Sequence, residues 1–252
     1  MNTAEESRLW FGTSGLVLPL PNKQAFPPEF RAGTRLTFYA SLFNSLEVNS
    51  SFYKIPMPGT FSKWVTEVPE DFRFTVKLWQ GITHSPQLSF NPADVDKFMH
   101  AANQLATKKG CLLIQLPPSL KADKADQLQF LLEQISQTQQ HWRLSVEFRN
   151  RTWYKPEIEK LLAQFKTTRV LHDIPASKIM ETTGDLPFIY LRFHGPAGDY
   201  KGGYGEAALK EYAEMIQKWQ RAGKEVYVYF NNTIGDAITD LEILRELTTP
   251  NH

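Results

Sequence analysis

Short apolar runs alternate with longer amphipathic segments along almost the whole chain. Each apolar run has the length of a strand, and the segments between them are long enough for helices. The expected strands span residues 9–12, 45–49, 73–77, 111–115, 143–147, 168–172, 188–194 and 225–230. The expected helices span residues 35–43, 60–67, 92–107, 124–137, 156–165, 206–222 and 236–247. This alternation predicts an α/β fold with a parallel sheet covered by helices.

Eight strands in this order predict one closed (β/α)8 barrel of the TIM type, formed by residues 1–252 as a single domain. The chain has 252 residues, and such barrels typically need about 250. The rhythm is weakest between the sixth and seventh strands, because the segment 175–187 is short for a full helix. An irregular connection is expected there.

Polar and apolar residues alternate within several of the expected strands. In the seventh strand Ile189, Leu191 and Phe193 share one face, while Tyr190, Arg192 and His194 share the other. Successive side chains on a strand point to opposite faces, so the apolar set is expected to meet the helices and the polar set to point inward. The other strands also end in polar residues, and in TIM barrels the carboxyl ends of the strands carry the active site.

The composition excludes several classes of protein. Hydrophobic residues make up 42% of the chain and charged residues 22%, and the formal net charge is +1. A net charge this small gives no overall basic field for nucleic acid or an anionic membrane. The single cysteine, Cys111, allows no disulfide within the chain and is expected in the core. Residues 1–8 are polar and resemble no secretory signal, and no apolar run reaches membrane-spanning length, so a cytoplasmic location is expected.

Nine short motifs occur in an order that resembles a known family. They are Phe11-Gly-Thr-Ser-Gly15, Phe43-Asn-Ser-Leu-Glu-Val-Asn49 with Ser51-Phe-Tyr53, Phe74-Thr-Val-Lys77, Ile82-Thr-His84, Leu113-Ile-Gln-Leu-Pro-Pro118, Glu147-Phe-Arg149 with Trp153, His172-Asp173, Tyr190-Leu-Arg-Phe-His-Gly195 and Tyr229-Phe-Asn-Asn-Thr233. Together they resemble the YecE-like family, domain of unknown function 72. The resemblance implies a TIM-like barrel and implies no chemistry. One departure is Leu16-Val-Leu-Pro-Leu20, where the family usually carries a tryptophan and often a tyrosine.

Two glutamates at strand ends are candidates for acid/base catalysis. Different environments can separate the pKa values of two carboxyl groups and so give them different roles, and Glu47 and Glu147 are the expected pair. His84 and His194 would donate or relay protons. The alternative is that each glutamate is a buried partner of Arg149, Arg192 or Lys77. If Glu147 is held ready for chemistry, Glu147→Gln is expected to leave thermal stability nearly unchanged or to raise it, whereas a large fall would favour a structural network.

Three cations at strand ends, Lys77, Arg149 and Arg192, are candidates for holding a phosphate or carboxylate group. An arginine side chain can bind two oxygens at once. A structural ion-pair network with the acidic residues is the equal alternative. The residues expected to bind substrate are Asn49, Tyr53, Lys77, Gln115, Arg149, Asp173, Tyr190, Arg192, Asn231 and Asn232.

Two further interpretations of the same residues are weaker. His84, His172 and His194 with Asp173 contain ligand types that suit a divalent metal, but no tight ligand spacing supports a metal site, so the cofactor is left unknown. Lys77 would need a lowered pKa to form a Schiff base, and the nearby acids are expected to keep it charged.

The sequence therefore favours an enzyme that acts on a small polar, anionic substrate by acid/base catalysis, in hydrolysis or in lyase or isomerase chemistry. The alternative is a non-catalytic binding protein for a phosphorylated metabolite or single-stranded nucleic acid. The expected partner is a small anionic molecule, with no membrane, with nucleic acid not favoured, and with the oligomeric state undetermined. The fold alone cannot choose between these functions.

Overall fold

Parallel strands form the centre of the computed structural model, which describes residues 8–138, 141–182 and 184–249. Residues 1–7, on which the expectation of no secretory signal largely depends, lie outside the described residues. The strands are β1 (Leu9–Thr13), β2 (Ser45–Val48), β3 (Arg73–Lys77), β4 (Lys109–Gln115), β5 (Arg143–Glu147), β6 (Thr168–Arg169), β7 (Leu171–His172), β8 (Ile189–Phe193) and β9 (Val226–Phe230). Their positions match the eight expected strands, with the sixth divided into β6 and β7.

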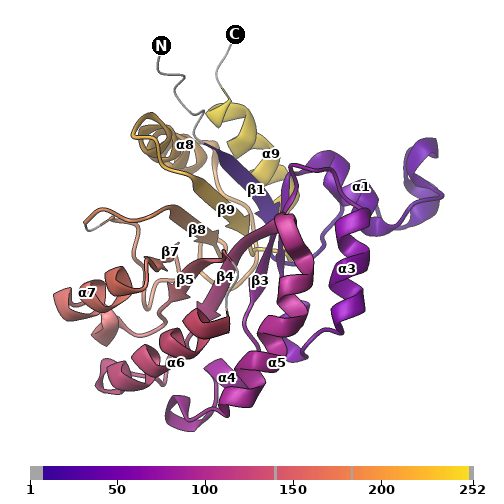
Figure 1. The fold of residues 1–252 in the computed structure, drawn as a ribbon. Helices are drawn as coiled ribbons and strands as arrows, with labels where there is room; N and C mark the ends of the chain where they lie inside the picture. The colour runs from indigo at the N-terminus through magenta and orange to yellow at the C-terminus, as the bar shows by residue number, and fades with distance from the viewer. Residues whose placement is uncertain (1–7, 139–140, 183, 250–252) are drawn as a thin grey trace, which may run out of the picture.

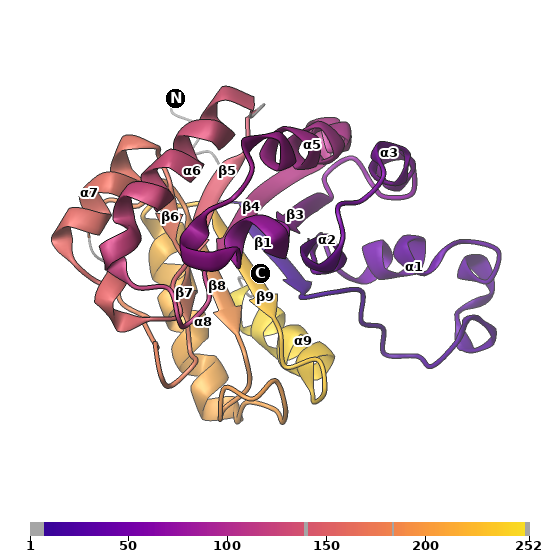
Figure 2. The same ribbon diagram turned by 90° about the horizontal axis from the view of Figure 1, so that it is seen from below.

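Helices follow most of the strands, as the alternation predicts. They are α1 (Arg35–Leu42), α2 (Ser50–Tyr53), α3 (Pro58–Thr66), α4 (Gln80–Thr83), α5 (Pro92–Ala102), α6 (Ala125–Thr138), α7 (Pro156–Gln164), α8 (Glu206–Arg221) and α9 (Ala237–Thr248). Figure 2 shows α5, α6, α7, α8 and α9 placed around the strands. The short helices α2 and α4, which the sequence did not predict, follow the carboxyl ends of β2 and β3 and so lie at the polar end of the strands.

The strands form two parallel sheets, with orders β1-β9-β8-β7 and β2-β3-β4-β5-β6. All of the strand pairs are parallel, which confirms the predicted α/β class. The two sheets meet at two places. Ser14, directly after β1, forms a parallel bridge with Glu47 of β2. Val170 separates β6 from β7, and its N–H donates to the carbonyl of Val146 in β5.

The connection from β7 to β8 is irregular, as expected from its length. The described residues of the segment 175–187 contain no helix. Instead, His172 forms an antiparallel bridge with Ile179. The chain thus returns along β7 before it enters β8, and no helix separates these neighbouring strands.

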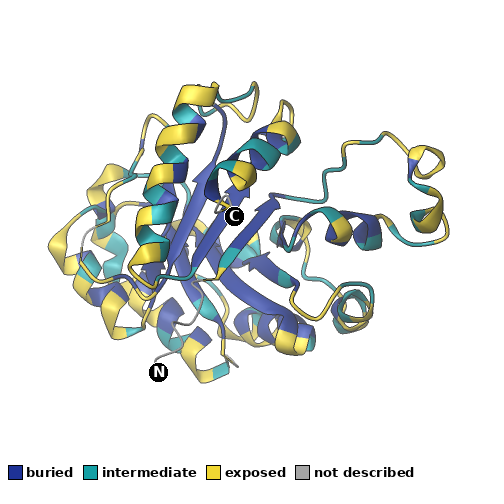
Figure 3. Ribbon diagram, turned by 90° about the horizontal axis from the view of Figure 1, so that it is seen from above, coloured by how far each residue is buried: buried dark blue, intermediate teal, exposed yellow. Residues whose placement is uncertain are grey.

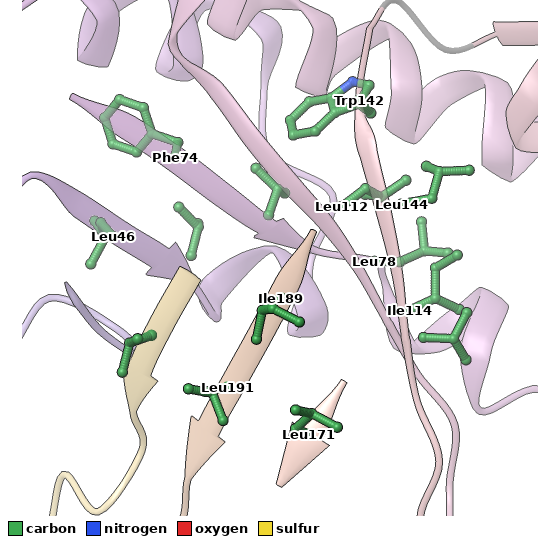
Figure 4. Close-up of a cluster of buried hydrophobic side chains, with 14 of the residues drawn as sticks. Leu46, Phe74, Leu78, Leu112, Ile114, Trp142, Leu144, Leu171, Ile189 and Leu191 are labelled. Carbon is green, nitrogen blue, oxygen red and sulfur yellow. The ribbon is translucent and has the colours of Figure 1, made fainter. Parts of the chain in front are cut away.

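The apolar faces of the strands form the main core against the helices. Figure 4 shows Leu46, Phe74, Leu112, Leu144 and Leu191, which come from five different strands, in one cluster. Figure 3 shows that the strands are buried while the outer faces of the helices are exposed. Side-chain alternation therefore sends alternate residues of each strand to the opposite, inner side.

A second buried cluster lies on the inner side of the strands. It consists of Trp10, Cys111, Leu113, Val170, Phe188, Tyr190, Tyr227 and Tyr229. These residues fill the space below the polar strand ends, and Cys111 is a core residue as expected. No helix within the described ranges is both long and apolar enough to cross a membrane.

The segment between β1 and α1 projects to one side of the molecule (Figure 1). Phe26 is fully buried there and its ring lies 4.4 Å from the ring of Phe38 in α1, measured between centroids. Leu16 and Leu18, which belong to the segment that departs from the family pattern, are partly buried against the main core. They therefore contribute packing and no aromatic surface.

Candidate functional site

Three charged side chains from β2, β5 and β8 meet at the carboxyl ends of the strands. Arg192 donates to Glu47 through Nε (2.9 Å) and Nη2 (2.7 Å), and to Glu147 through Nη1 (2.5 Å). The side chains of all three are fully buried. One guanidinium is thus held between two carboxylates that belong to the same sheet, while Arg192 belongs to the other.

Glu47 has further hydrogen-bond donors besides Arg192. The hydroxyl of Ser14 donates to Oε1 at 2.6 Å, and the hydroxyl of Tyr190 donates to Oε2. Burial acts to raise the pKa of Glu47, but the charge and hydrogen bonds of Arg192 outweigh it, and the pKa lies below its ordinary value of 4.5. Glu47 is therefore ionised at neutral pH, and both of its carboxylate oxygens accept hydrogen bonds from protein groups.

Glu147 is held in the same way by two guanidinium groups. Nε of Arg149 donates to Oε1, and Arg192 donates to Oε2. Burial acts to raise the pKa of Glu147, yet Arg149 and Arg192 together hold it well below 4.5. Different environments were expected to separate the two carboxyl pKa values. Both pKa values lie below 4.5, so both glutamates are ionised at neutral pH, and their contacts are those of the ion-pair alternative. The catalytic roles of Glu47 and Glu147 stay a prediction.

His194 continues this network away from the glutamates. Its Nδ1 lies 3.1 Å from Oδ1 of Asp173, and its Nε2 accepts from Arg149 (3.2 Å) and Arg192 (3.3 Å). Since an arginine can only donate, the proton of the neutral ring lies on Nδ1. Burial is the main cause that lowers the pKa of His194 to about 4. In this arrangement the neutral ring of His194 accepts from two guanidinium groups and donates through Nδ1 to Asp173. Its expected role in donating or relaying protons stays a prediction.

Asp173 is fixed by a residue that the sequence did not single out. The hydroxyl of Tyr204 donates to Oδ2 of Asp173 and accepts the N–H of Gly195 at 2.7 Å. The backbone N–H of His194 donates to Oδ1 of Asp173 at 2.9 Å. Tyr204 comes from the loop between β8 and α8, and no pattern in that loop marks its hydroxyl in advance.

Lys77, at the end of β3, differs from the two arginines. Its Nζ lies 4.0 Å from the ring centroid of Phe52, and within residues 8–138, 141–182 and 184–249 it makes no ion pair or hydrogen bond. Burial first, and then the positive charge of Arg192, lower the pKa of Lys77 to about 8, although Glu147 and Glu47 act to raise it. Glu147 and Glu47 act in the expected direction, and Lys77 stays mostly charged at pH 7. Their effect is smaller than that of burial, because both carboxylates are already paired with Arg192.

We expect the Lys77→Met variant to be more stable than the wild type at pH 7, by on the order of 1–3 kcal/mol. Because the folded-state pKa is about 8 against an ordinary 10.5, charging Lys77 opposes folding. This cost is complete below pH 8 and disappears as the pH rises towards 10.5 and beyond, so the difference between the two proteins should shrink over that range. The groups acting on Lys77 are Glu47, Glu147, Arg149, Arg192 and His84.

Urea unfolding at pH 7 and pH 10 measures this effect. Lys210→Met is the control, because Lys210 pairs with Glu206 on the exposed face of α8. It should change the free energy of unfolding little at either pH. A loss of stability in Lys77→Met at pH 7 would mean that the ammonium has favourable contacts in the fold.

His84 lies on the Lys77 side of the cluster. Its ring meets Phe52 edge-on at 5.0 Å, and its Nδ1 lies 2.9 Å from the hydroxyl oxygen of Thr83. Burial, followed by the charges of Lys77 and Arg149, lowers the pKa of His84 to about 4. The ring is neutral at pH 7 and can accept a hydrogen bond, but it holds no proton to donate as an imidazolium.

Three further predicted substrate-binding residues, Asn49, Tyr53 and Gln115, lie at the polar ends of the strands. Oδ1 of Asn49 is buried without a hydrogen-bond partner, and Tyr53 is 70% exposed. Gln115 is buried and donates to the carbonyl of Leu116 at 3.2 Å. Asn49 directly follows β2, Tyr53 ends α2 and Gln115 ends β4, so all three lie at the polar ends of the strands.

The two asparagines after β9 behave differently from each other. Asn231 is half-buried and its N–H donates to the carbonyl of Phe193 at 2.7 Å. Asn232 is fully buried and its Nδ2 donates to Asp240 of α9 and to the carbonyl of Gly202, both at 2.8 Å. Asn232 therefore ties β9 to α9 and is not brought to the charged network.

Two of the candidate metal ligands, His172 and His194, are engaged with protein groups at both ring nitrogens. Nε2 of His172 lies 3.0 Å from the carbonyl oxygen of Phe148, and its Nδ1 accepts from the N–H of Ile174 at 3.3 Å. Both ring nitrogens of His194 are also occupied. Among the residues that the structure describes, no three His, Cys, Asp or Glu side chains group as metal ligands.

Comparison with known proteins places this chain in a family. The model of the family described as "Protein of unknown function DUF72" matches residues 10–252. The chain belongs to the DUF72 family. It is 27% identical over 249 residues to the UPF0759 protein YunF of Bacillus subtilis, covering 85% of this chain and 86% of that protein. It is 33% identical over 84 residues to the UPF0759 protein YecE of Escherichia coli, covering 33% of this chain and 31% of that protein.

Two solved DUF72 structures share the fold. A crystal structure from Enterococcus faecalis has a TM-score of 0.77 at 21% identity and covers 97% of this chain and 99% of its own. A crystal structure from Thermotoga maritima has a TM-score of 0.75 at 25% identity and covers 96% of this chain and 100% of its own. The DUF72 assignment predicted from the nine motifs is confirmed, and no activity comes with it.

Proposed function

We propose that this DUF72 protein binds a small molecule carrying a carboxylate or phosphate group, and that Lys77 and Arg149 hold that group at the carboxyl ends of the strands. The observation that carries the proposal is the unpaired ammonium of Lys77, which is 9% exposed in a cluster whose other cations are paired. A buried cation without a counter-charge is costly, and an anionic ligand would remove that cost.

The charge balance of the cluster supports an anion as the ligand. Lys77, Arg149 and Arg192 carry positive charge against the two carboxylates Glu47 and Glu147. Asp173 is bonded to His194 and Tyr204, and within the described residues it makes no ion pair with Lys77, Arg149 or Arg192. One positive charge is therefore left over on the side of the site where Lys77 lies.

Arg149 is the second contact to the anion. Its Nε binds Glu147 and its Nη2 binds His194, whereas its Nη1 makes no hydrogen bond to any residue described in the structure. The side chain is 10% exposed. A guanidinium fixed at two of its nitrogens offers the third without loss of side-chain freedom, which favours binding.

We propose that the two sheets form one closed ring. The site then occupies the position of a TIM-barrel active site. The bridge between Ser14 and Glu47 supports closure at one junction. The unbroken chain from Thr168 to His172, which pairs with β5 at its start and β8 at its end, supports closure at the other. In this arrangement Lys77 and Arg149 lie at the mouth, where ligands of such barrels bind.

Titration calorimetry with inorganic phosphate and with pyruvate, at low ionic strength, tests the proposed binding. The wild type is expected to bind at least one of these anions. The Lys77→Met variant should bind it at least about tenfold more weakly, because about 1.4 kcal/mol is a modest value for one buried charge contact. Lys155→Met, which removes an exposed lysine just before α7, should bind as the wild type does. Equal binding by Lys77→Met, or no binding by the wild type, would overturn the proposal.

A further inference from the structure

We infer that Lys77 is a nucleophile, whose amine forms a Schiff base with the carbonyl group of an anionic aldehyde or ketone. This inference rests on the proposed anion site and adds a reaction to it. The ligand class has two parts, a carbonyl carbon for Lys77 and a nearby carboxylate or phosphate for Arg149.

The position of Lys77 meets the geometric needs of such a nucleophile. The hydroxyl of Ser51 donates to the backbone carbonyl of Lys77 at 2.7 Å and fixes the end of β3. The side chain is buried, and Nζ lies over the face of Phe52. Lys108 provides the contrast, because its Nζ donates to the carbonyl of Pro69 at 2.5 Å and is occupied by that bond. No such bond within the described residues restrains Nζ of Lys77.

The surroundings of Lys77 also supply the neutral amine that attack requires. A lysine becomes nucleophilic when burial or a neighbouring cation lowers its pKa. Both causes act here, since burial and Arg192 bring the pKa of Lys77 to about 8. At pH 7 about a tenth of the molecules then carry the free amine, against fewer than about one in a thousand for a lysine with an ordinary pKa.

The reaction needs no further reagent beyond the carbonyl compound. The lone pair of Nζ forms a bond to the carbonyl carbon, the C=O π electrons move to the oxygen, and one proton passes from nitrogen to that oxygen. The resulting carbinolamine loses its hydroxyl group and a second nitrogen proton as water, which leaves a C=N bond to Nζ. The carbonyl oxygen leaves as water, and no atom is oxidised or reduced overall.

His84 is placed to assist the proton movements. The hydroxyl of Thr83 lies 3.4 Å from the carbonyl of Trp79, to which it can donate, so it accepts the Nδ1 proton of His84. Nε2 of His84 then carries the lone pair and makes no hydrogen bond to a described residue. A neutral ring beside Lys77 can accept the hydroxyl of the carbinolamine without competing for the anion. In this scheme His84 contacts the reacting oxygen and is a second catalytic residue beside Lys77.

Borohydride trapping tests the inference directly. The full-length protein is incubated at pH 8 with pyruvate or with dihydroxyacetone phosphate, reduced with sodium borohydride, and examined by intact mass and peptide mapping. We expect one reduced adduct per chain, located on Lys77. An adduct with pyruvate alone would assign the anionic group as a carboxylate, and one with dihydroxyacetone phosphate alone would assign it as a phosphate.

Two variants separate the reaction from binding and from burial alone. Lys77→Arg keeps the positive charge and should still bind the anion, but it should give no adduct. Lys109→Arg is the matched control, because Lys109 is as buried as Lys77, has a pKa lowered by burial, and lies at the opposite, amino end of β4. It should trap as the wild type does.

The possible failures are distinguishable. Adducts on Lys109 or spread over exposed lysines would show that burial or general reactivity is sufficient, and would overturn the inference. Absence of an adduct with both compounds, in a protein that binds phosphate or pyruvate by calorimetry, would overturn the Schiff base and leave the anion site standing. Absence of binding as well would overturn both.

Discussion

The Arg192→Met variant is expected to lose about 3–5 kcal/mol of its free energy of unfolding, or to fail to fold. Removing one member of a buried ion pair typically has a cost in this range, because the remaining charge stays buried without a partner. Arg192 is opposed by both Glu47 and Glu147, and all three side chains are fully buried. The upper end of the range is therefore expected, which is a large share of the roughly 5–15 kcal/mol that typically stabilises a protein.

Urea unfolding of the purified variant measures this loss, and two further variants interpret it. Arg143→Met breaks an arginine–glutamate pair with Glu225 at the other end of the strands, where the arginine side chain is 36% exposed. Its cost should be about 1 kcal/mol or less, because water solvates the charge that remains. Arg192→Met combined with Glu47→Gln should recover part of the stability, since it removes one of the two buried carboxylates that Arg192→Met leaves without a partner. A wild-type free energy of unfolding in Arg192→Met would show that Glu47 and Glu147 do not depend on this guanidinium.

Glu147→Gln is expected to lower stability by about 3 kcal/mol at pH 7. Glu147 is fully buried and bound by Arg149 and Arg192, so its loss leaves two cations with less compensation. In this variant Arg192 still pairs with Glu47, and the side chain of Arg149 is 10% exposed and so partly solvated. The loss of free energy of unfolding is therefore expected at the lower end of the range for buried ion pairs. This expected loss differs from the sequence-based prediction that the variant would be nearly as stable as the wild type or more stable.

The acid dependence of stability should change in the same variant. Since the folded-state pKa of Glu147 is depressed below 4.5, its contribution is complete above that pH and is lost as the pH falls through the folded pKa. Glu47 behaves alike. Wild-type stability should therefore fall steeply below about pH 4.5, and the Glu147→Gln curve should fall less steeply. Unchanged or raised stability in Glu147→Gln at pH 7 would restore the case for a carboxylate held ready for catalysis.

Alternation within the strands was sufficient to predict which residues meet. The pattern of β8 places Tyr190, Arg192 and His194 on one face, and the structure brings all three into one hydrogen-bonded network with Glu47 and Glu147. The face to which each side chain of a strand points follows from alternation along that strand alone, so a single sequence reveals it. Parallel strands then bring their carboxyl ends together at one end of the fold.

The pairing within that network could not be predicted in the same way. Which carboxylate meets which cation depends on how strands far apart in sequence face one another across the interior. The sequence left open whether Glu47 and Glu147 are catalytic acids or ion-pair partners. The contacts with Arg192 and Arg149, which only the structure reveals, favour ion-pair partners. The lowered pKa of Lys77 could not be predicted for the same reason, because it depends on the acids near Lys77 being already paired with Arg192.

Residues outside the strands are harder to predict. Asn231 and Asn232 were both expected to bind substrate, but alternation gives no side-chain direction beyond the end of β9. The side chain of Asn232 instead binds Asp240 and the carbonyl of Gly202. Tyr204 was missed because it reaches Asp173 from an irregular loop, where side-chain direction follows no period.

The contact between Glu47 and Arg192 also constrains the order of folding. The two residues are separated by 145 positions and lie in different sheets. Contacts of such long sequence separation form late, because a long loop must close before they are gained. Until then both charges remain solvated, and the partly folded chain has no buried charge network. The buried ion-pair network of Arg192 with Glu47 and Glu147 is therefore assembled only when the two sheets have come together, and a fragment holding one sheet would lack it.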